Sequence, residues 1–198
     1  MTGQRLYIDI DDVLAETTRS LARHARSHFG KDVSFEKMTT FDLRISLQLH
    51  EDEYPSFMDE VHRPDFLRAL PPTADAPQVL AIWKASGARI DLVTGRPSKS
   101  RQATIDWLED HSIIYDSLEF IDKYGRYSEE PTARLSDLAD RHYKFAIEDS
   151  ASVATYLAKN TRSRVLLYDR PWNQNTPLKN GPIKRVFTWR DIREEIQL

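Results

Sequence analysis

The sequence contains no cysteine among its 198 residues. Disulfide bonds and thiolate metal sites are therefore excluded, so any bound metal must be held by oxygen or imidazole ligands. Long apolar runs are also missing, and the chain begins without the basic and apolar regions of a signal peptide. We therefore expect a cytoplasmic protein with no membrane partner.

An excess of positive charge is lacking as well. The formal net charge is −3, and no basic run resembles a stripe that would follow a phosphate backbone, so a nucleic acid polymer is disfavoured as a partner. The histidines offer one pair at helical spacing, His24 and His28, without a third ligand. This argues against zinc, and we expect the pair to lie on a solvated helix face.

Apolar and polar residues alternate in a way that predicts strands separated by helices. We expect a first strand over 6–10 and further strands over 88–93, 118–121, 143–147, 164–168 and 185–187. The expected helices include 100–110, 132–139 and 153–159, and Gly30 is placed to end a helix that follows the first strand. The fold class is α/β, with a doubly wound, Rossmann-like and mostly parallel sheet.

Between the first strand and residue 72 the pattern changes. Aromatic residues are spread among acids and short helical pieces, and no convincing strand is present. We therefore expect a catalytic core formed by residues 1–15 and 73–198, with a small helical cap inserted over residues 16–72. A cap above the sheet would exclude water from a site at that edge.

Polar residues cluster where three of the expected strands end. Asp9, Asp11 and Asp12 follow the first strand, Thr94-Gly95-Arg96 follows the second, and Glu148-Asp149-Ser150 follows a later one. Each cluster alone is compatible with a turn or a helix cap, and Asp12 is expected to do that. In an open α/β sheet, however, ligands bind at the carboxyl ends of the strands.

Together these clusters predict a phosphate site. The carboxylates would hold a divalent cation, for which Mg²⁺ is the natural choice, while Thr94 and the amides of Gly95 and Arg96 would take phosphate oxygens. Asp9 would be free to attack phosphorus. A lysine is also expected, and Lys123 is favoured over Lys144 because Lys144 opens its strand at the opposite edge.

These residues resemble the signature of the haloacid dehalogenase-like phosphatase superfamily, and most of all the 5′(3′)-deoxyribonucleotidase family. The likeness is carried by the segments YIDIDDVLA (7–15), LVTGRP (92–97), FAIEDS (145–150) and LLYDRPWN (166–173). The resemblance implies an Mg²⁺-dependent phosphomonoesterase that acts through an aspartyl-phosphate intermediate on (deoxy)nucleoside monophosphates. Asp12 departs from the glycine that many superfamily members carry there, and Lys123 stands further from the acidic pair than the nucleotidase branch leads us to expect.

The resemblance also implies individual roles. Asp9 would be the nucleophile, and Asp11 would protonate the leaving oxygen and then activate water. The metal ligands would be the Asp9 carboxylate, the Asp11 backbone carbonyl and one of Glu148 or Asp149. Thr94 and Lys123 would hold the phosphoryl group. If Lys123 did not, Lys144 or Arg134 would supply the charge.

Other interpretations stay open from the sequence. The substrate could be another small phosphomonoester, such as a sugar phosphate, and a phospho-accepting receiver module uses similar residues in a different strand order. A phosphatase-like binding protein without turnover is not favoured, because both Asp9 and Asp11 are present. Several cap residues could contact a base or sugar, although packing is favoured for the aromatics and plain surface exposure for the arginines: Phe41, Phe57, Phe66, Arg44 and Arg63. Trp172 and Trp189 are expected to pack the C-terminal segment onto the core.

Overall fold

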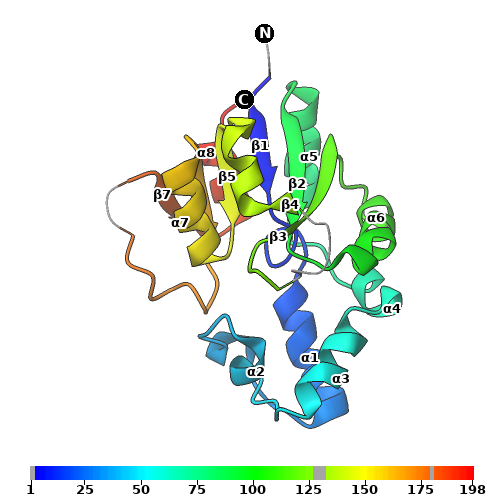
Figure 1. Cartoon of the computed structure of the whole chain (residues 1–198). Helices are drawn as coiled ribbons and strands as arrows, with labels where there is room; N and C mark the ends of the chain where they lie inside the picture. Colours follow the sequence, from blue (N-terminus) through cyan, green and yellow to red (C-terminus); the bar gives the residue numbers. More distant parts are fainter. Residues whose placement is uncertain (1–2, 127–132, 179–180) are drawn as a thin grey trace.

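The computed structural model describes residues 3–126, 133–178 and 181–198 (Figure 1). The strands are β1 (Arg5–Ile8), β2 (Arg89–Thr94), β3 (Ser117–Asp122), β4 (Ala133–Arg134), β5 (Phe145–Glu148), β6 (Arg164–Tyr168) and β7 (Ile183–Val186). The α-helices are α1 (Thr17–Phe29), α2 (Leu43–Ser46), α3 (Glu53–Val61), α4 (Pro64–Arg68), α5 (Ala76–Ala85), α6 (Arg101–Asp110), α7 (Ala151–Asn160) and α8 (Trp189–Glu195). Short 3₁₀ helices cover Phe35–Lys37, Ser98–Ser100 and Leu135–Arg141.

The described strands form one parallel sheet in the order β4-β3-β2-β1-β5-β6-β7. The chain moves outward from β1 through β2 to β4, then returns to the other side of β1 with β5. That reversal next to β1 is the topological switch point, where open α/β sheets bind ligands at the carboxyl ends of their strands. The α/β, doubly wound fold expected from the sequence is confirmed.

Helices cover both faces of the sheet, because successive side chains of a strand point to opposite sides. Leu6 and Ile8 pack into the core shared with α5, α6 and α8, whereas Tyr7 points into the core shared with α7. Two of the three largest fully buried side chains, Trp83 and Trp189, meet in the first of these cores with ring centroids 5.9 Å apart. β1 is therefore packed on both faces of the sheet, and this packing fixes the position of the residues that follow it.

The helical segment, residues 16–72, lies at the carboxyl ends of the strands (Figure 1). It has a small core of its own, in which Phe57 of α3 is fully buried together with apolar residues of α1. Gly30 ends α1 in the left-handed conformation, with φ of 66°, and its N–H donates to the carbonyl of Ala25. At its far end the segment joins the main core, where Leu67 of α4 is buried.

Three local predictions need correction. Of the helix expected over 132–139, Thr132 lies outside the described residues; 133–134 form β4, and a 3₁₀ helix rather than an α-helix follows. The last strand is 183–186, and α8 after it was not expected. His28 is exposed as expected, but His24 is largely covered: its Nε2 lies 2.7 Å from a Glu60 carboxylate oxygen, and its ring stacks on His28. Among the described residues, no helix has the length and apolar character that crossing a membrane requires.

Candidate active site

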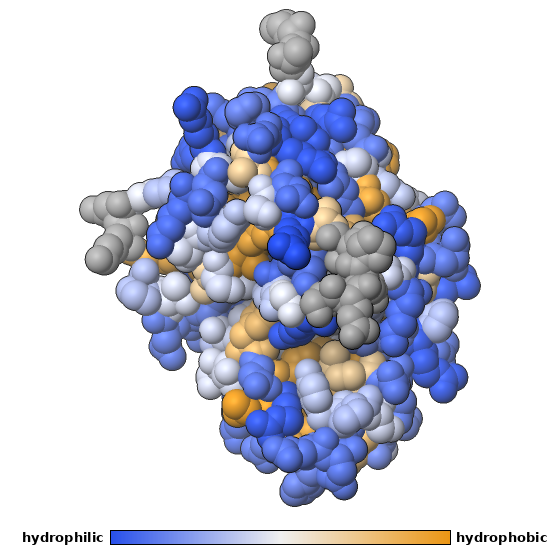
Figure 2. All heavy atoms as spheres, in the orientation of Figure 1, coloured by the Kyte–Doolittle hydropathy of each residue, from blue (hydrophilic) through white to orange (hydrophobic). Residues whose placement is uncertain are grey.

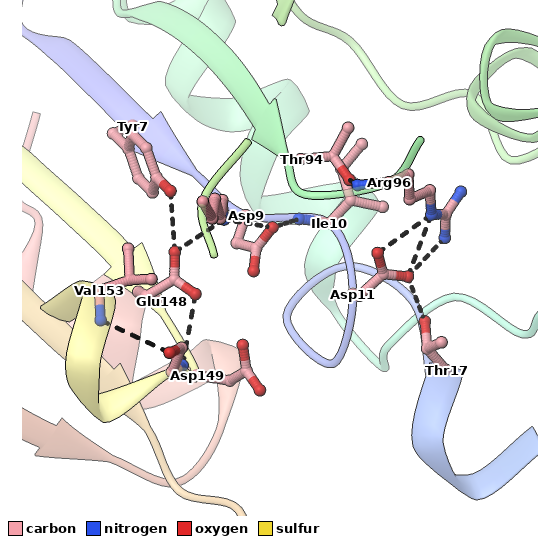
Figure 3. Close-up of polar contacts among 12 residues, drawn as sticks. Tyr7, Asp9, Ile10, Asp11, Thr17, Thr94, Arg96, Glu148, Asp149 and Val153 are labelled. Atoms are coloured by element: carbon pink, nitrogen blue, oxygen red, sulfur yellow. Dashed lines mark hydrogen bonds and ion pairs between the residues drawn. The ribbon is translucent and has the colours of Figure 1, made fainter. Parts of the chain in front are cut away.

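The residues expected to form a site come together at one edge of the sheet (Figure 3). Asp9 follows β1, Thr94 ends β2, Lys123 follows β3, and Glu148 ends β5 with Asp149 directly after it. All five side chains are buried or nearly so. β1, β2 and β5 are neighbours, so their carboxyl ends deliver these groups to the same place.

A buried lysine stands at the centre of this cluster. Lys123 Nζ lies 2.9 Å from Asp9 Oδ1 and 2.9 Å from Glu148 Oε2, and the lysine side chain is 1% exposed. The Tyr7 hydroxyl donates to the same Glu148 oxygen at 2.8 Å. The backbone N–H of Ile10 donates to Asp9 Oδ1 at 2.7 Å, which fixes the orientation of that carboxylate.

The electrostatics of the cluster show an excess of negative charge. Burial raises the pKa of Asp9 well above its ordinary value, Glu148 adds to this effect, and Lys123 acts against it. Burial and the neighbouring acids Glu148 and Asp9 likewise raise the pKa of Asp149. The pKa of Glu148 is lowered: burial would raise it, but Lys123 and its hydrogen bonds outweigh that effect. One ammonium group therefore does not balance three carboxylates.

These carboxylates fit a divalent cation. One oxygen each from Asp9, Glu148 and Asp149 lies within 4.8 Å of the others, and all three residues are buried. A set made only of oxygen ligands is the one that magnesium and calcium prefer, and the cation would supply the positive charge that the cluster lacks. The Asp11 carboxylate is outside this group, in keeping with its expected contribution through the backbone carbonyl alone.

The Asp11 carboxylate pairs with an arginine and does not join the cluster of Asp9, Glu148 and Asp149. Arg96, which is 5% exposed, donates from Nη2 to Asp11 Oδ1 at 2.7 Å and from Nε to both carboxylate oxygens at 3.1 Å. Its Nη1 donates to Thr104 Oγ1 at 3.1 Å, and Thr17 donates to Asp11 at 2.7 Å. Burial alone would raise the pKa of Asp11, but Arg96 lowers it overall, so the group is a carboxylate here.

The turn after β2 is tightly packed against the lysine. Thr94 is fully buried, and its hydroxyl accepts a hydrogen bond from the Arg96 N–H at 3.2 Å. A Cβ added to Gly95 would lie 3.2 Å from a ring carbon of Tyr124 and 3.4 Å from Lys123 Cδ. Glycine at this position therefore lets the side chain of Lys123 reach the site.

Asp12 is a structural residue, as expected from the turn interpretation. Its φ is 58°, in the left-handed region that favours glycine, asparagine and aspartate. Its carboxylate accepts the Thr18 N–H at 2.9 Å and also the Thr18 hydroxyl. The chain thereby turns from β1 into the first turn of α1, and burial raises the pKa of Asp12 to about 7.

The other cations considered from the sequence lie elsewhere. Lys144 is exposed at the amino end of β5, where its N–H donates to the carbonyl of Arg5. Arg134 is exposed in β4. Lys123 is therefore the lysine that lies with the acids, despite its unexpected spacing in the sequence.

A cavity of about 490 Å³ opens above the acids, between the sheet edge and the helical segment. In Figure 2, hydrophobic atoms gather where these two parts meet, with hydrophilic atoms around them. Of the candidate cap residues, Phe41 and Arg44 line the cavity, and the Phe41 ring lies 5.3 Å from that of Tyr124. Phe57 belongs to the core of the helical segment, and Phe66 packs partly buried against it.

Sequence reasoning missed three residues that contact the acids, Tyr7, Thr17 and Trp172, and also Tyr124, which lines the cavity. A signal existed for Tyr7, which stands two residues before Asp9 and so lies on the same side of the strand. Trp172 was expected only to pack. Instead its indole Nε1 donates to Asp149 Oδ2 at 2.9 Å, and its ring lines the cavity. Trp189 is buried in the core as expected.

A known protein family matches more than half of the chain. The family described as "5′ nucleotidase, deoxy (Pyrimidine), cytosolic type C protein" matches residues 4–125, which include Asp9, Asp11, Thr94 and Lys123. A candidate nucleotidase of Halalkalibacterium halodurans is 23% identical over 190 residues, which cover 96% of this chain and 91% of that protein.

Solved structures share the fold over nearly the whole chain. A HAD-family hydrolase from Deinococcus radiodurans, with bound phosphate and sodium, gives a TM-score of 0.64 at 12% identity, covering 98% of this chain and 95% of that one. A HAD-hydrolase from Bacillus subtilis, bound to magnesium, gives 0.63 at 10% identity and covers both chains fully. The similarity to haloacid dehalogenase-like proteins expected from the motifs is confirmed.

Proposed function

The chain belongs to the family of 5′ nucleotidases, deoxy (pyrimidine), cytosolic type C, and from that premise we propose that it removes phosphate from deoxynucleoside monophosphates. Membership makes it a phosphoric monoester hydrolase, as the strand-end residues predict. The observation that carries the proposal is that Asp9 and Asp149 line one cavity, with Lys123 and Glu148 buried beside them. A cytosolic location is proposed from the family description alone.

Asp9 is proposed as the nucleophile. The Ile10 N–H fixes one of its oxygens, and Lys123 lies within 2.9 Å of that same oxygen. An incoming phosphoryl group would meet the ammonium of Lys123, which would balance charge on its oxygens, and the hydroxyl of Thr94, which would donate a hydrogen bond to them. Attack by Asp9 on phosphorus would form an aspartyl-phosphate and release the nucleoside, replacing one difficult displacement with two easier ones.

We propose Mg²⁺ as the cation held by Asp9, the Asp11 carbonyl and Asp149. Bound there, it would neutralise charge on the acids and on the phosphoryl oxygens. Asp149 is preferred to Glu148 as the direct ligand, because Glu148 already accepts hydrogen bonds from Tyr7 and Lys123. In this arrangement Glu148 would position Lys123, and Asp149 would bind the cation.

Asp11 is proposed to move the protons. Paired with Arg96, it is ionised, the form that accepts a proton from the water attacking the aspartyl-phosphate. Donating a proton to the leaving oxygen in the first step requires the opposite form. Phosphoryl oxygens that draw the Arg96 guanidinium towards themselves would weaken its ion pair with Asp11 and raise the pKa of Asp11. Substrate binding would thereby promote protonation of Asp11.

The cavity supports a nucleotide rather than a sugar phosphate. Its volume of about 490 Å³ falls in the range of small-molecule sites. Away from the acids its lining combines polar groups with apolar and aromatic side chains, among them Met38, Phe41 and Tyr124. The aromatic faces suit stacking with a base, a contact that a sugar phosphate lacks.

Phosphate release from a panel of monophosphates tests the proposal. The panel compares 5′- and 3′-monophosphates of pyrimidine and purine deoxynucleosides with sugar phosphates, each with and without Mg²⁺. We expect Mg²⁺-dependent release from the deoxynucleotides, and none from the Asp9→Asn variant. A preference for sugar phosphates would contradict the substrate assignment, and release by Asp9→Asn would contradict the nucleophile. A phosphorylated protein without turnover would favour the receiver-like alternative.

A further inference from the structure

Trp172 links an acid of the site to the helical segment. It lies in the turn that follows β6, half-buried, with its indole N–H donating to Asp149 Oδ2 at 2.9 Å. Hydrogen bonds to a charged oxygen are roughly twice as strong as those between neutral groups. The indole therefore restricts the orientation of the Asp149 carboxylate, one of the three acids that fit a cation.

The next residue fixes the backbone of the same acid. Asn173 is fully buried, and its side-chain amide donates to the carbonyls of Asp149 and Tyr168, both at 2.8 Å. Its carbonyl oxygen in turn accepts from Arg185. The turn after β6 thus holds Asp149 twice, through the side chain by Trp172 and through the main chain by Asn173.

The other side of the Trp172 ring touches the helical segment. Phe35, in the 3₁₀ helix between α1 and α2, meets the indole edge to face, with centroids 5.7 Å apart and planes at 81°. Phe35 is buried, and the Arg19 guanidinium of α1 lies 3.9 Å from the centre of its ring. A continuous line of contacts therefore runs from the site acid, through Trp172, to α1.

We propose that Trp172 is a positioning residue that joins the Asp149 carboxylate to the helical segment, so that cation binding and docking of that segment favour one another. The inference rests on the cation site of the proposed function. A cation that pulls Asp149 into place also sets the indole against Phe35, and a docked segment holds the indole where it orients Asp149. Coupling of this kind is reciprocal by thermodynamic necessity.

The test is Mg²⁺ binding measured by calorimetry without substrate. Trp172→Phe keeps a ring against Phe35 but loses the indole N–H, and we expect about tenfold weaker Mg²⁺ binding, as for other partners of metal ligands. Phe35→Leu, which leaves the acids untouched, should weaken Mg²⁺ binding about threefold, because it removes an edge-to-face contact.

Ser163→Ala is the matched control. It too loses one buried side-chain hydrogen bond, here from the Ser163 hydroxyl to the carbonyl of Tyr143 at 2.8 Å, just before β6 and away from both the acids and the helical segment. Its Mg²⁺ affinity should equal that of the wild type even if its stability falls. A structural loss is thereby separated from a loss of positioning.

Hydrogen exchange gives the second measurement. Mg²⁺ should slow amide exchange over residues 31–49 in the wild type and in Ser163→Ala, but much less in Trp172→Phe. Wild-type affinity and wild-type protection in Trp172→Phe would overturn the inference and leave the cation site standing. If the wild-type protein binds no Mg²⁺, the inference fails together with the proposed cation site, a result that the calorimetry distinguishes from the first.

Discussion

Replacing Lys123 by methionine should destabilise the protein strongly while keeping the length of the side chain. The ammonium is 2.9 Å from both Asp9 and Glu148 and has 1% of its side chain exposed, so no water takes its place easily. Removing one partner of a buried ion pair costs about 3–5 kcal/mol, because the remaining charge is left uncompensated. For a domain of this size, that corresponds to a melting temperature lower by about 10 °C.

The pH dependence follows from the acids that remain. In the wild type the pKa of Glu148 is lowered in the folded state, so its contribution to stability is present above its unfolded pKa and is lost as pH falls. The variant lacks this contribution. Asp9, whose pKa burial already raises, would lose the opposing effect of Lys123 and become costlier as an anion. The stability difference should therefore be largest near about pH 8 and shrink towards about pH 5.

Urea unfolding at several pH values, without and with Mg²⁺, measures this difference. Lys144→Met is the matched control, because Lys144 is exposed at the opposite edge of the sheet. We expect the control to unfold like the wild type, and Mg²⁺ to return part of the lost stability to Lys123→Met by supplying positive charge. Equal stability of the two variants, or a difference that does not vary with pH, would refute the assignment of Lys123 as the counter-ion of the acids.

Substitutions at three further positions test local parts of the account. Gly95→Ala should lower kcat/KM about tenfold with little loss of stability, because its methyl group would lie 3.2 Å from the Tyr124 ring and displace the neighbouring lysine; steady-state kinetics check this. Asp12→Ala should cost about 3 kcal/mol in urea unfolding, from its left-handed φ and the lost Thr18 hydrogen bonds, and Asp12→Gly should cost less. Phe57→Ala should lower the free energy of unfolding by about 3–5 kcal/mol, since the ring is fully buried.

The sheet and the site acids could be predicted because each strand carries its own signal. An apolar run followed by polar residues gives both the strand and its carboxyl end, as at Asp9, Thr94 and Glu148. The parallel α/β pattern then places those ends on one edge without any knowledge of contacts. Asp12 was predictable for a similar local reason, because aspartate tolerates the left-handed conformation that the turn requires.

Other features depend on contacts between residues far apart in the sequence. Arg96 was expected to bind substrate, and its ion pair with Asp11 arises only when the ends of β1 and β2 become neighbours. The bond from Trp172 to Asp149 likewise needs β5 and β6 side by side. At 132–139, Leu135 and Leu138 are spaced for a helix, but pairing of β4 with β3 and a 3₁₀ helix override that local preference.

Trapping the phosphorylated enzyme tests the central claim most directly. Asp11→Asn lacks the base for the second step, so acid quenching during reaction with an aryl phosphate, whose leaving group needs no proton, should leave the phosphoryl group on the protein. Mass spectrometry of the digested protein should locate that group on Asp9, and Asp9→Asn should show none. A phosphoryl group on another residue, or turnover by an enzyme that never carries one, would contradict the account.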